Sequence, residues 1–197
     1  MSNSYTNTTT IASRLALVEA DLSYADVDLL QAAIDWASDF IDDWCHRVFS
    51  ANHATRYYTR HDVDPCDSHL LYLGEDLVRI DAVSNGDTTN ITGAEYVLEP
   101  RNADAENRPY YALRLLSTSA FVWPTDGYVQ VSGLWGYSSA PDAVIVGCCL
   151  RLAEYHYRSK APQTSTTLFD GSLQKELPQG FPTDVLTVLD QRKRLAS

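Results

Sequence analysis

The 197-residue chain lacks the features that define several large classes of protein. Its longest uninterrupted apolar run, Ala143–Leu150, is far shorter than the roughly 20 residues of a membrane-spanning helix. The start, MSNSYTNTTT, has neither the positive flank nor the apolar stretch of a secretory signal, so we expect a cytoplasmic site of synthesis. Four cysteines, two of them adjacent, do not form a disulfide framework, and we expect reduced thiols.

The chain also lacks recognisable machinery for catalysis or for gripping nucleic acid. It has no Gly-rich phosphate loop, no Ser or Cys in a nucleophile context and no carboxylates converging in a cleft. Its net charge is -11, and the only basic cluster is Arg192-Lys193-Arg194, whereas proteins that hold DNA by its phosphates carry a basic stripe. We therefore expect no enzymatic activity, no cofactor and no tight DNA binding.

Two residue patterns leave alternatives open. The spacing His61-x4-Cys66-x2-His69 invites a zinc site, but it fits no standard finger, and surface histidines explain it more simply. The aromatic residues could form a carbohydrate-binding surface, although aromatics in a strand-rich domain usually form core and cross-strand pairs. We expect no bound metal.

The composition and periodicity instead indicate a folded α+β protein. Hydrophobic residues make up 45% and charged residues 21%, as in ordinary soluble domains with a core. Residues 24–49 repeat apolar side chains at spacings of three and four, which predicts a long amphipathic helix whose buried stripe is Leu30, Ile34, Ala37, Ile41, Trp44 and Val48. A shorter helix is expected over residues 11–19, after a polar and mobile arm.

Opposite the apolar stripe, the long helix carries a row of carboxylates that we call the acidic row: Asp28, Asp35, Asp39 and Asp42. Like charges at i,i+4 destabilise an isolated helix by a few tenths of a kcal/mol, roughly, so the row does not help the helix to form. It is either an ordinary solvated face or a functional surface.

The middle of the chain changes to the short, aromatic-rich segments typical of strands. We predict about six mostly antiparallel strands, at residues 56–60, 70–73, 77–83, 95–98, 110–116 and 128–135. Asn85-Gly86 predicts a two-residue hairpin turn into a strand near residues 90–92. Residues 100–109 read as a surface loop.

Helical patterns return after Pro141. The helix over residues 141–158 has an apolar face wider than one partner helix requires, which suggests burial on two sides. A polar loop over residues 161–180 leads to a short helix over residues 183–195 with Val185, Val188 and Leu189 on one side and a basic end. This helix either docks on a partner or packs on its own subunit.

The prediction is a single domain, a helical bundle of long N-terminal and C-terminal helices with an inserted small antiparallel β-rich region. Its expected parts are a mobile arm (1–10), helices (11–50), a β-rich insertion (55–136), a helix (141–160), a loop (161–180) and a C-terminal docking helix (181–197).

The order of several short motifs resembles the head-to-tail connector (adaptor) proteins of tailed bacteriophages and gene transfer agents. The motifs are Ala37-Ser38, Ile41-Asp42, Cys45-His46-Arg47-Val48-Phe49, Tyr96-Val97-Leu98, Val129 to Tyr137, Pro141, Tyr155-His156-Tyr157-Arg158, Leu177-Pro178-Gln179-Gly180, Val185-Leu186 and Arg192. The resemblance covers about residues 11–195, and the long loop 161–180 departs from the family pattern.

The resemblance implies a structural protein of the virion neck, assembled in a bacterial host cytoplasm. It implies a dodecameric ring under the portal protein, a tail-side stopper or tail terminator as second partner, and a channel through which DNA passes without specific binding. The acidic row would then line the channel. The portal-docking residues would be Phe181, Val185, Val188, Leu189, Arg192, Arg194 and Leu195. The alternatives are a tail-associated carbohydrate- or receptor-binding module and, closer to the connector, another tail-completion protein.

Overall fold

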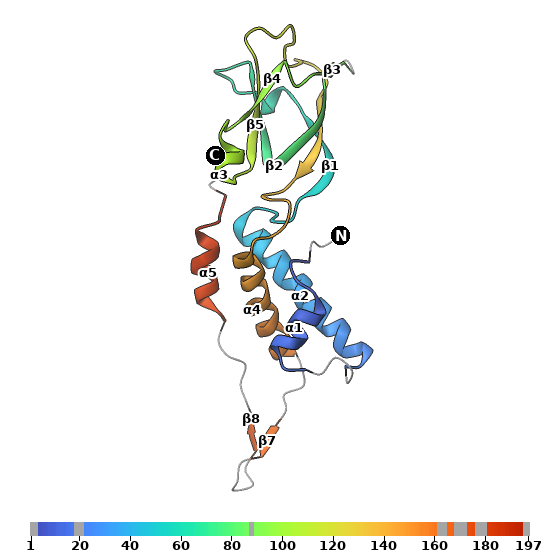
Figure 1. The fold of residues 1–197 in the computed structure, drawn as a ribbon, viewed down its shortest axis with the longest axis vertical. Helices are drawn as coiled ribbons and strands as arrows, with labels where there is room; N and C mark the ends of the chain where they lie inside the picture. Colours follow the sequence, from blue (N-terminus) through green and yellow to red (C-terminus); the bar gives the residue numbers. More distant parts are fainter. Residues whose placement is uncertain are drawn as a thin grey trace. The chain divides into compact units, whose positions relative to one another are not determined.

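A computed structural model describes residues 4–17, 22–86, 89–160, 165–167, 173–175 and 181–194. Contacts divide the chain into two compact units (Figure 1). The helical unit comprises residues 1–46 and 141–197, and the sheet unit comprises residues 47–140. The mixed α+β class is confirmed. The single-domain organisation stays a prediction, and each unit is described by itself.

The helical unit is built from segments at both ends of the chain: α1 (Thr8–Arg14), α2 (Tyr24–Cys45), α4 (Ala143–Lys160) and α5 (Thr183–Asp190). The long helix α2 begins after Ser23, whose side chain and that of Asp26 form a reciprocal capping box. It packs against α4 along its apolar stripe. The residues fully buried there are Leu30, Ile34, Ala37 and Ile41 of α2 and Ile145, Cys149 and Leu152 of α4.

The predicted end of α2 was wrong. The helix stops at Cys45 because His46 adopts a left-handed conformation, with φ 52°, and its amide closes the last turn on the Asp42 carbonyl. Val48 therefore lies outside the helix and is exposed, and Trp44 is only half-buried. The stripe contributes a core as far as Cys45 and no further.

The expected N-terminal arm and first helix were also misplaced. Asn7 caps a helix that begins at Thr8, because its side chain accepts from the Thr10 amide. Ile11 and Ala12 of α1 are buried, and Tyr5 is only 4% exposed. The mobile arm predicted for residues 1–10 is thus wrong over residues 4–10.

The C-terminal part of the helical unit contains more strand and less helix than expected. Within the predicted loop 161–180, β7 (Ser165–Thr167) and β8 (Leu173–Lys175) pair as a two-stranded antiparallel sheet. The final helix, α5, ends at Asp190 instead of Leu195. The motif at residues 177–180 and Leu195 lie outside the described residues.

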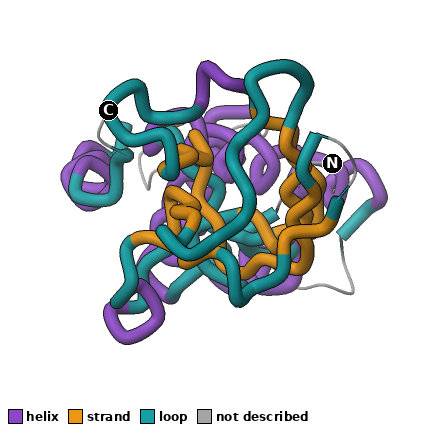
Figure 2. The backbone as a smooth tube through the Cα atoms, turned by 90° about the horizontal axis from the view of Figure 1, so that it is seen from above, coloured by secondary structure: helices purple, strands orange, loops and turns teal. Residues whose placement is uncertain are grey.

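The sheet unit is a six-stranded antiparallel sheet, with its order β1-β6-β2-β5-β4 and with β3 paired to β2. Its strands are β1 (Asn52–Tyr58), β2 (Leu70–Ser84), β3 (Asn90–Ile91), β4 (Tyr96–Glu99), β5 (Tyr110–Leu115) and β6 (Val129–Trp135). Strands that are far apart in the sequence, such as β1 and β6, lie side by side, and the strands can be followed in Figure 2. The predicted loop 100–109 contains a short helix, α3 (Ala103–Glu106).

Three details of the predicted strands needed correction. The segments 70–73 and 77–83 are one strand, β2, which bends where its register against β5 shifts between Tyr72 and Leu77. Gly74 lies in that bend with φ 64°. The pairing of β2 with residues 90–91 is confirmed, but the Asn85 amide donates to the Thr89 carbonyl, so the connection is longer than a two-residue turn. Arg60 lies not in β1 but in η2 (Arg60–Asp62), a 3₁₀ turn capped by Thr59.

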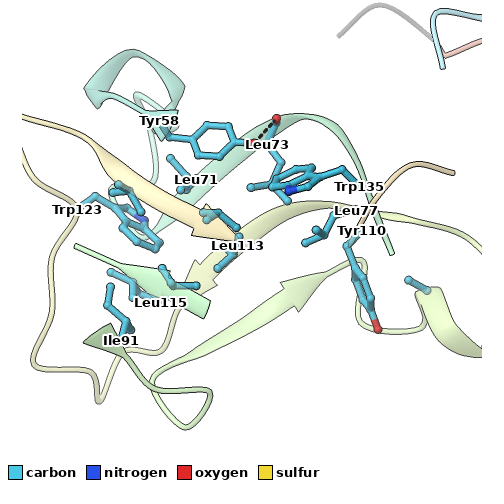
Figure 3. Close-up of a cluster of buried hydrophobic side chains, with 14 residues drawn as sticks. Tyr58, Leu71, Leu73, Leu77, Ile91, Tyr110, Leu113, Leu115, Trp123 and Trp135 are labelled. Carbon is cyan, nitrogen blue, oxygen red and sulfur yellow. Dashed lines mark hydrogen bonds between the residues drawn. The ribbon is translucent and has the colours of Figure 1, made fainter. Parts of the chain in front are cut away.

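The core of the sheet unit is a cluster of aliphatic and aromatic side chains on one side of the sheet (Figure 3). Trp123 lies near Leu115 and Ile91 at one end, and Trp135 lies near Leu77 at the other. The polar atoms of its large aromatics are satisfied: the Tyr58 hydroxyl donates to the Leu73 carbonyl, Trp123 Nε1 to His69 and Trp135 Nε1 to Ala54, all at 2.9 Å. The unit therefore has an internal core of its own.

Candidate functional site

The structure divides the acidic row of α2 into two classes of carboxylate. Asp28 and Asp39 are exposed, whereas Asp35 and Asp42 are partly covered. The covering comes from the N-terminal segment: the Ser4 hydroxyl donates to Asp35 Oδ1 at 2.7 Å, and the Tyr5 hydroxyl donates to Asp42 Oδ1. The row is therefore not a uniform solvated face, and two of its four members are exposed.

Tyr5 is the residue that fixes this N-terminal segment. Its amide donates to the hydroxyl of the buried Ser38 at 3.1 Å, and its ring is almost fully buried. Ser38 in turn lies 3.5 Å from the Cys149 sulfur of α4. A small polar cluster thus lies between α2, α4 and the N-terminal segment. No periodic pattern predicts this cluster, because a single tyrosine in a polar stretch does not repeat.

Asp42 is electrostatically unusual among the row. Burial raises the pKa of its carboxyl to about 7, the bond from Tyr5 opposes that rise, and the nearby charges of Asp39 and Asp43 add to it. The carboxyl is thus partly protonated near neutral pH. It belongs to the packing of the helical unit more than to the exposed surface.

The predicted portal-docking helix packs on its own subunit. Val185 and Leu189 of α5 are buried within the helical unit, and Val188 is half-buried. Phe181 contacts Phe40 of α2, with ring centroids 5.6 Å apart, and Tyr155 of α4, at 5.3 Å. The alternative in which this helix completes its own subunit is therefore the arrangement observed.

The basic end of the chain is likewise engaged inside the helical unit. Arg192 pairs with Asp142 at 2.6 Å, and Lys193 lies 4.0 Å from the centre of the Trp44 ring while pairing with Asp190 at 2.8 Å. The Arg194 amide donates to the Cys45 carbonyl at 2.9 Å. The sequence predicts that these basic residues pair with acidic residues of a partner protein. For Arg192 and Lys193, the acidic residues belong to the same subunit.

An aromatic row on α2 was missed from the sequence. Trp36, Phe40 and Trp44 recur at intervals of four, with successive ring centroids 5.5 and 5.8 Å apart, and His156 stacks on Trp36 at 4.4 Å. This aromatic row lies beside the apolar stripe of α2. Its member Phe40 contacts Phe181, just before α5, and so helps to hold α5 in the helical unit. The i,i+4,i+8 spacing could have identified it.

The two alternative site types find little support in the sheet unit. Over the described residues no group of three or more His, Cys, Asp or Glu side chains is placed to hold a metal ion. The exposed Tyr57 and Tyr128 meet edge to face, with an interplanar angle of 82°, so they do not form the flat platform on which a sugar ring stacks. Nor does any described helix combine the length and apolar character needed to cross a bilayer.

The described fold combines helices with a six-stranded antiparallel sheet, and comparison with known proteins finds a similar fold in gene transfer agent (GTA) particles. A chain of the neck of an empty GTA particle, computed with C6 symmetry, superposes with a TM-score of 0.62 at 15% identity, covering 98% of this chain and 91% of that one. A chain of the virion of a native GTA particle gives 0.61 at 14%, with the same coverage.

A third chain, from the neck of a native GTA particle computed with C12 symmetry, gives a TM-score of 0.56 at 14% identity and covers 100% of this chain and 97% of that one. No protein-family model and no curated protein matches the sequence. At these identities the comparisons establish a shared fold along almost the whole chain.

Proposed function

We propose that this protein is a non-enzymatic structural subunit of a virion neck, a head-to-tail connector that forms a ring between the portal and the tail. The observation that carries the proposal is the likeness in fold to two chains from GTA necks and one from a GTA virion, which extends over 98–100% of the chain. Those necks were resolved with sixfold and twelvefold symmetry, which supports a cyclic assembly of twelve copies.

The acidic row supports a channel for DNA in one respect. Asp28 and Asp39 are exposed on α2, and their repetition around a ring would create a negative wall that repels phosphates. Asp35 and Asp42 contribute less to such a wall, because the N-terminal segment covers them. In this proposal the channel face is therefore carried by Asp28 and Asp39.

We still propose that the C-terminal segment binds the portal, but through fewer residues than the sequence predicts. Val185 and Leu189 are buried within the helical unit, and Phe181 and Arg192 have partners there. Phe181, Val188, Arg192 and Arg194 all keep partly exposed side chains, and Phe181 and Arg192 are already engaged within the subunit. We propose that Val188 and Arg194 face the portal while α5 stays packed, and that the tail-side stopper or terminator binds elsewhere.

Electron microscopy of the purified protein tests the proposal. Negatively stained images with and without the portal protein should show rings, or caps on the portal ring. Arg194→Glu should weaken co-sedimentation with portal, whereas Arg79→Glu, a change of equal charge in the sheet unit, should not. Absence of rings and caps under all conditions would refute the connector role.

The channel is tested separately in assembled particles. Replacing Asp28 and Asp39 by Asn should slow DNA ejection at low ionic strength and have little effect at high salt, where charge is screened. Matched neutral substitutions of exposed acids in the sheet unit, Asp126→Asn with Glu106→Gln, provide the control. Equal ejection by both variants at every salt concentration would leave the row as a solvated face.

A further inference from the structure

The sheet unit contains a pocket that neither the core nor the proposed neck role uses. It has a volume of about 320 Å³ and lies where η2 and the following turn approach the segment at residues 123–124. Its apolar wall is made by Val63, Pro65, Trp123 and Pro124, and its polar side is lined by Arg60, His61, Asp64 and Ser68. Trp123 is the end member of the core cluster (Figure 3), so this wall is held rigidly.

The acids nearest to this pocket are committed to their own turns. Asp64 accepts from the Cys66 amide at 2.7 Å, the Asp67 amide at 3.0 Å and the Tyr72 hydroxyl at 2.9 Å. These bonds hold the pKa of its carboxyl below the ordinary value. The next carboxylate, Asp62, accepts from the Thr59 amide at 2.7 Å and from the Thr59 hydroxyl.

Arg60 consequently has no carboxylate partner among the described residues, although most arginines of the sheet unit do. Arg56, Arg79, Arg101, Arg108 and Arg114 each lie within ion-pair distance of a carboxylate of the same unit. An arginine beside an apolar wall, whose neighbouring acids already accept hydrogen bonds, can still pair with an incoming carboxylate through its planar fork.

We propose that this pocket binds an acidic peptide segment of a partner protein, which pairs a carboxylate with Arg60 and seats an apolar side chain against Trp123 and Pro124. A phosphate polymer fits less well, because the sheet unit carries seven basic and twelve acidic residues and would repel a polyanion as a whole. A single carboxylate can pair locally with Arg60, because both oxygens of the neighbouring Asp64 already accept hydrogen bonds. The assignment does not depend on the neck role.

Fluorescence anisotropy with the full chain tests this site. The probe is a dye-labelled Gly-Ser-Phe-Asp-Gly-Ser peptide, and the matched probe replaces its Asp by Asn. The acidic probe should bind and the neutral probe should bind on the order of 5-fold more weakly, as expected for loss of one charge-assisted pair. Binding of both probes with equal affinity, or of neither, would overturn the proposal.

Two variants tie the binding to the pocket. Arg60→Gln should weaken binding of the acidic probe by the same factor. Ser68→Trp, which places a large side chain at the pocket lining, should abolish binding of that probe. Arg79→Gln, at an exposed arginine of the same unit, is the control and should bind as wild type. Circular dichroism verifies that each variant is folded.

A competition experiment tests whether the pocket prefers a carboxylate or a phosphate. Inorganic phosphate at 10-fold excess over the probe should not displace the acidic peptide. Displacement by phosphate, or wild-type affinity in both Arg60→Gln and Ser68→Trp, would show that the pocket is not a site for acidic peptides. Since the probe is bound by the subunit itself, these outcomes are distinguishable from failure of ring formation.

Discussion

The two units of this chain form their cores in different ways. The sheet unit is one continuous stretch, residues 47–140, and the polar atoms of its buried aromatics bond to backbone carbonyls inside the unit. The helical unit is assembled from both ends of the chain and partly buries Asp42, whose carboxyl has a raised pKa, whereas the buried carboxylate of the sheet unit, Asp76, lies 3.7 Å from the Arg47 guanidinium. The sheet unit should therefore be most sensitive to steric change, and the helical unit to loss of burial and to pH.

The largest effect is expected at Gly133 of β6. A Cβ atom there would lie 2.3 Å from the Arg79 carbonyl oxygen and 3.2 Å from the Ile80 Cα, both of which belong to the backbone and cannot move aside easily. Gly133→Ala should therefore cost about 3–5 kcal/mol of unfolding free energy. Urea unfolding followed by tryptophan fluorescence measures this loss.

Gly93→Ala is the matched control in the same unit, because no atom lies within 4 Å of its added Cβ. Its unfolding midpoint should stay near that of the wild type. If both alanine variants unfold at the same urea concentration, the close approach of β2 to β6 at Gly133 is not present in solution.

The second prediction concerns α5 of the helical unit. Leu189 is fully buried, so Leu189→Ala should cost about 2–4 kcal/mol through lost burial and the cavity left behind. Thr187→Ala, on the exposed side of the same helix, should change stability by less than about 0.5 kcal/mol. Thermal unfolding distinguishes a core helix from a docking helix: a melting temperature unaffected by Leu189→Ala would mean that α5 leaves its seat in solution.

Much of the fold of the two units could be predicted from the sequence, because regular periodicity indicates which face of a helix or strand is buried. The apolar stripe of α2 and the alternating segments of β5 and β6 led to the right elements and the right class of fold. The helix end at Cys45 could not be predicted, since the left-handed His46 is an ordinary residue whose conformation is set by tertiary context.

The candidate sites were less predictable, for a related reason. The row Asp28, Asp35, Asp39 and Asp42 was visible as a helical face, but its division into exposed and covered members depends on Ser4 and Tyr5, some 30 residues away in sequence. Similarly, the partners of α5 are single residues on α2 and α4. Contacts between distant segments leave no local pattern from which they could be inferred.

The third prediction uses the charge within the helical unit. The pKa of Asp42 is about 7 in the folded protein, above the ordinary value of 3.8 for an aspartate, so its neutral form is favoured by folding. Its stabilising contribution is full below pH 3.8 and is lost as the pH rises to about 7. Asp42→Asn removes this loss, and the variant should be the more stable protein at pH 8.

One pKa unit corresponds to ~1.4 kcal/mol, but the carboxyl is only partly buried and solvent screens it, so we expect a gain of about 1–2 kcal/mol at pH 8. Asp28→Asn, an exposed member of the same row, provides the control. Urea unfolding at pH 5 and pH 8 measures the effect. Parallel pH profiles for Asp42→Asn and wild type would contradict the burial of this carboxyl.

The smallest expected effect is at Gly147 of α4, where the same substitution as at Gly133 should have the opposite sign. No atom lies within 4 Å of a Cβ added there, and alanine is favoured over glycine in a helix by roughly 0.5–1 kcal/mol. Gly147→Ala should therefore stabilise the isolated subunit by about that amount, measured by urea unfolding. A loss of stability would mean that this side of α4 is more closely covered than the subunit alone requires. Because a ring brings a second copy against each subunit, a variant that is stabilised as a monomer but no longer forms rings would assign the Gly147 side of α4 to the contact between neighbouring copies.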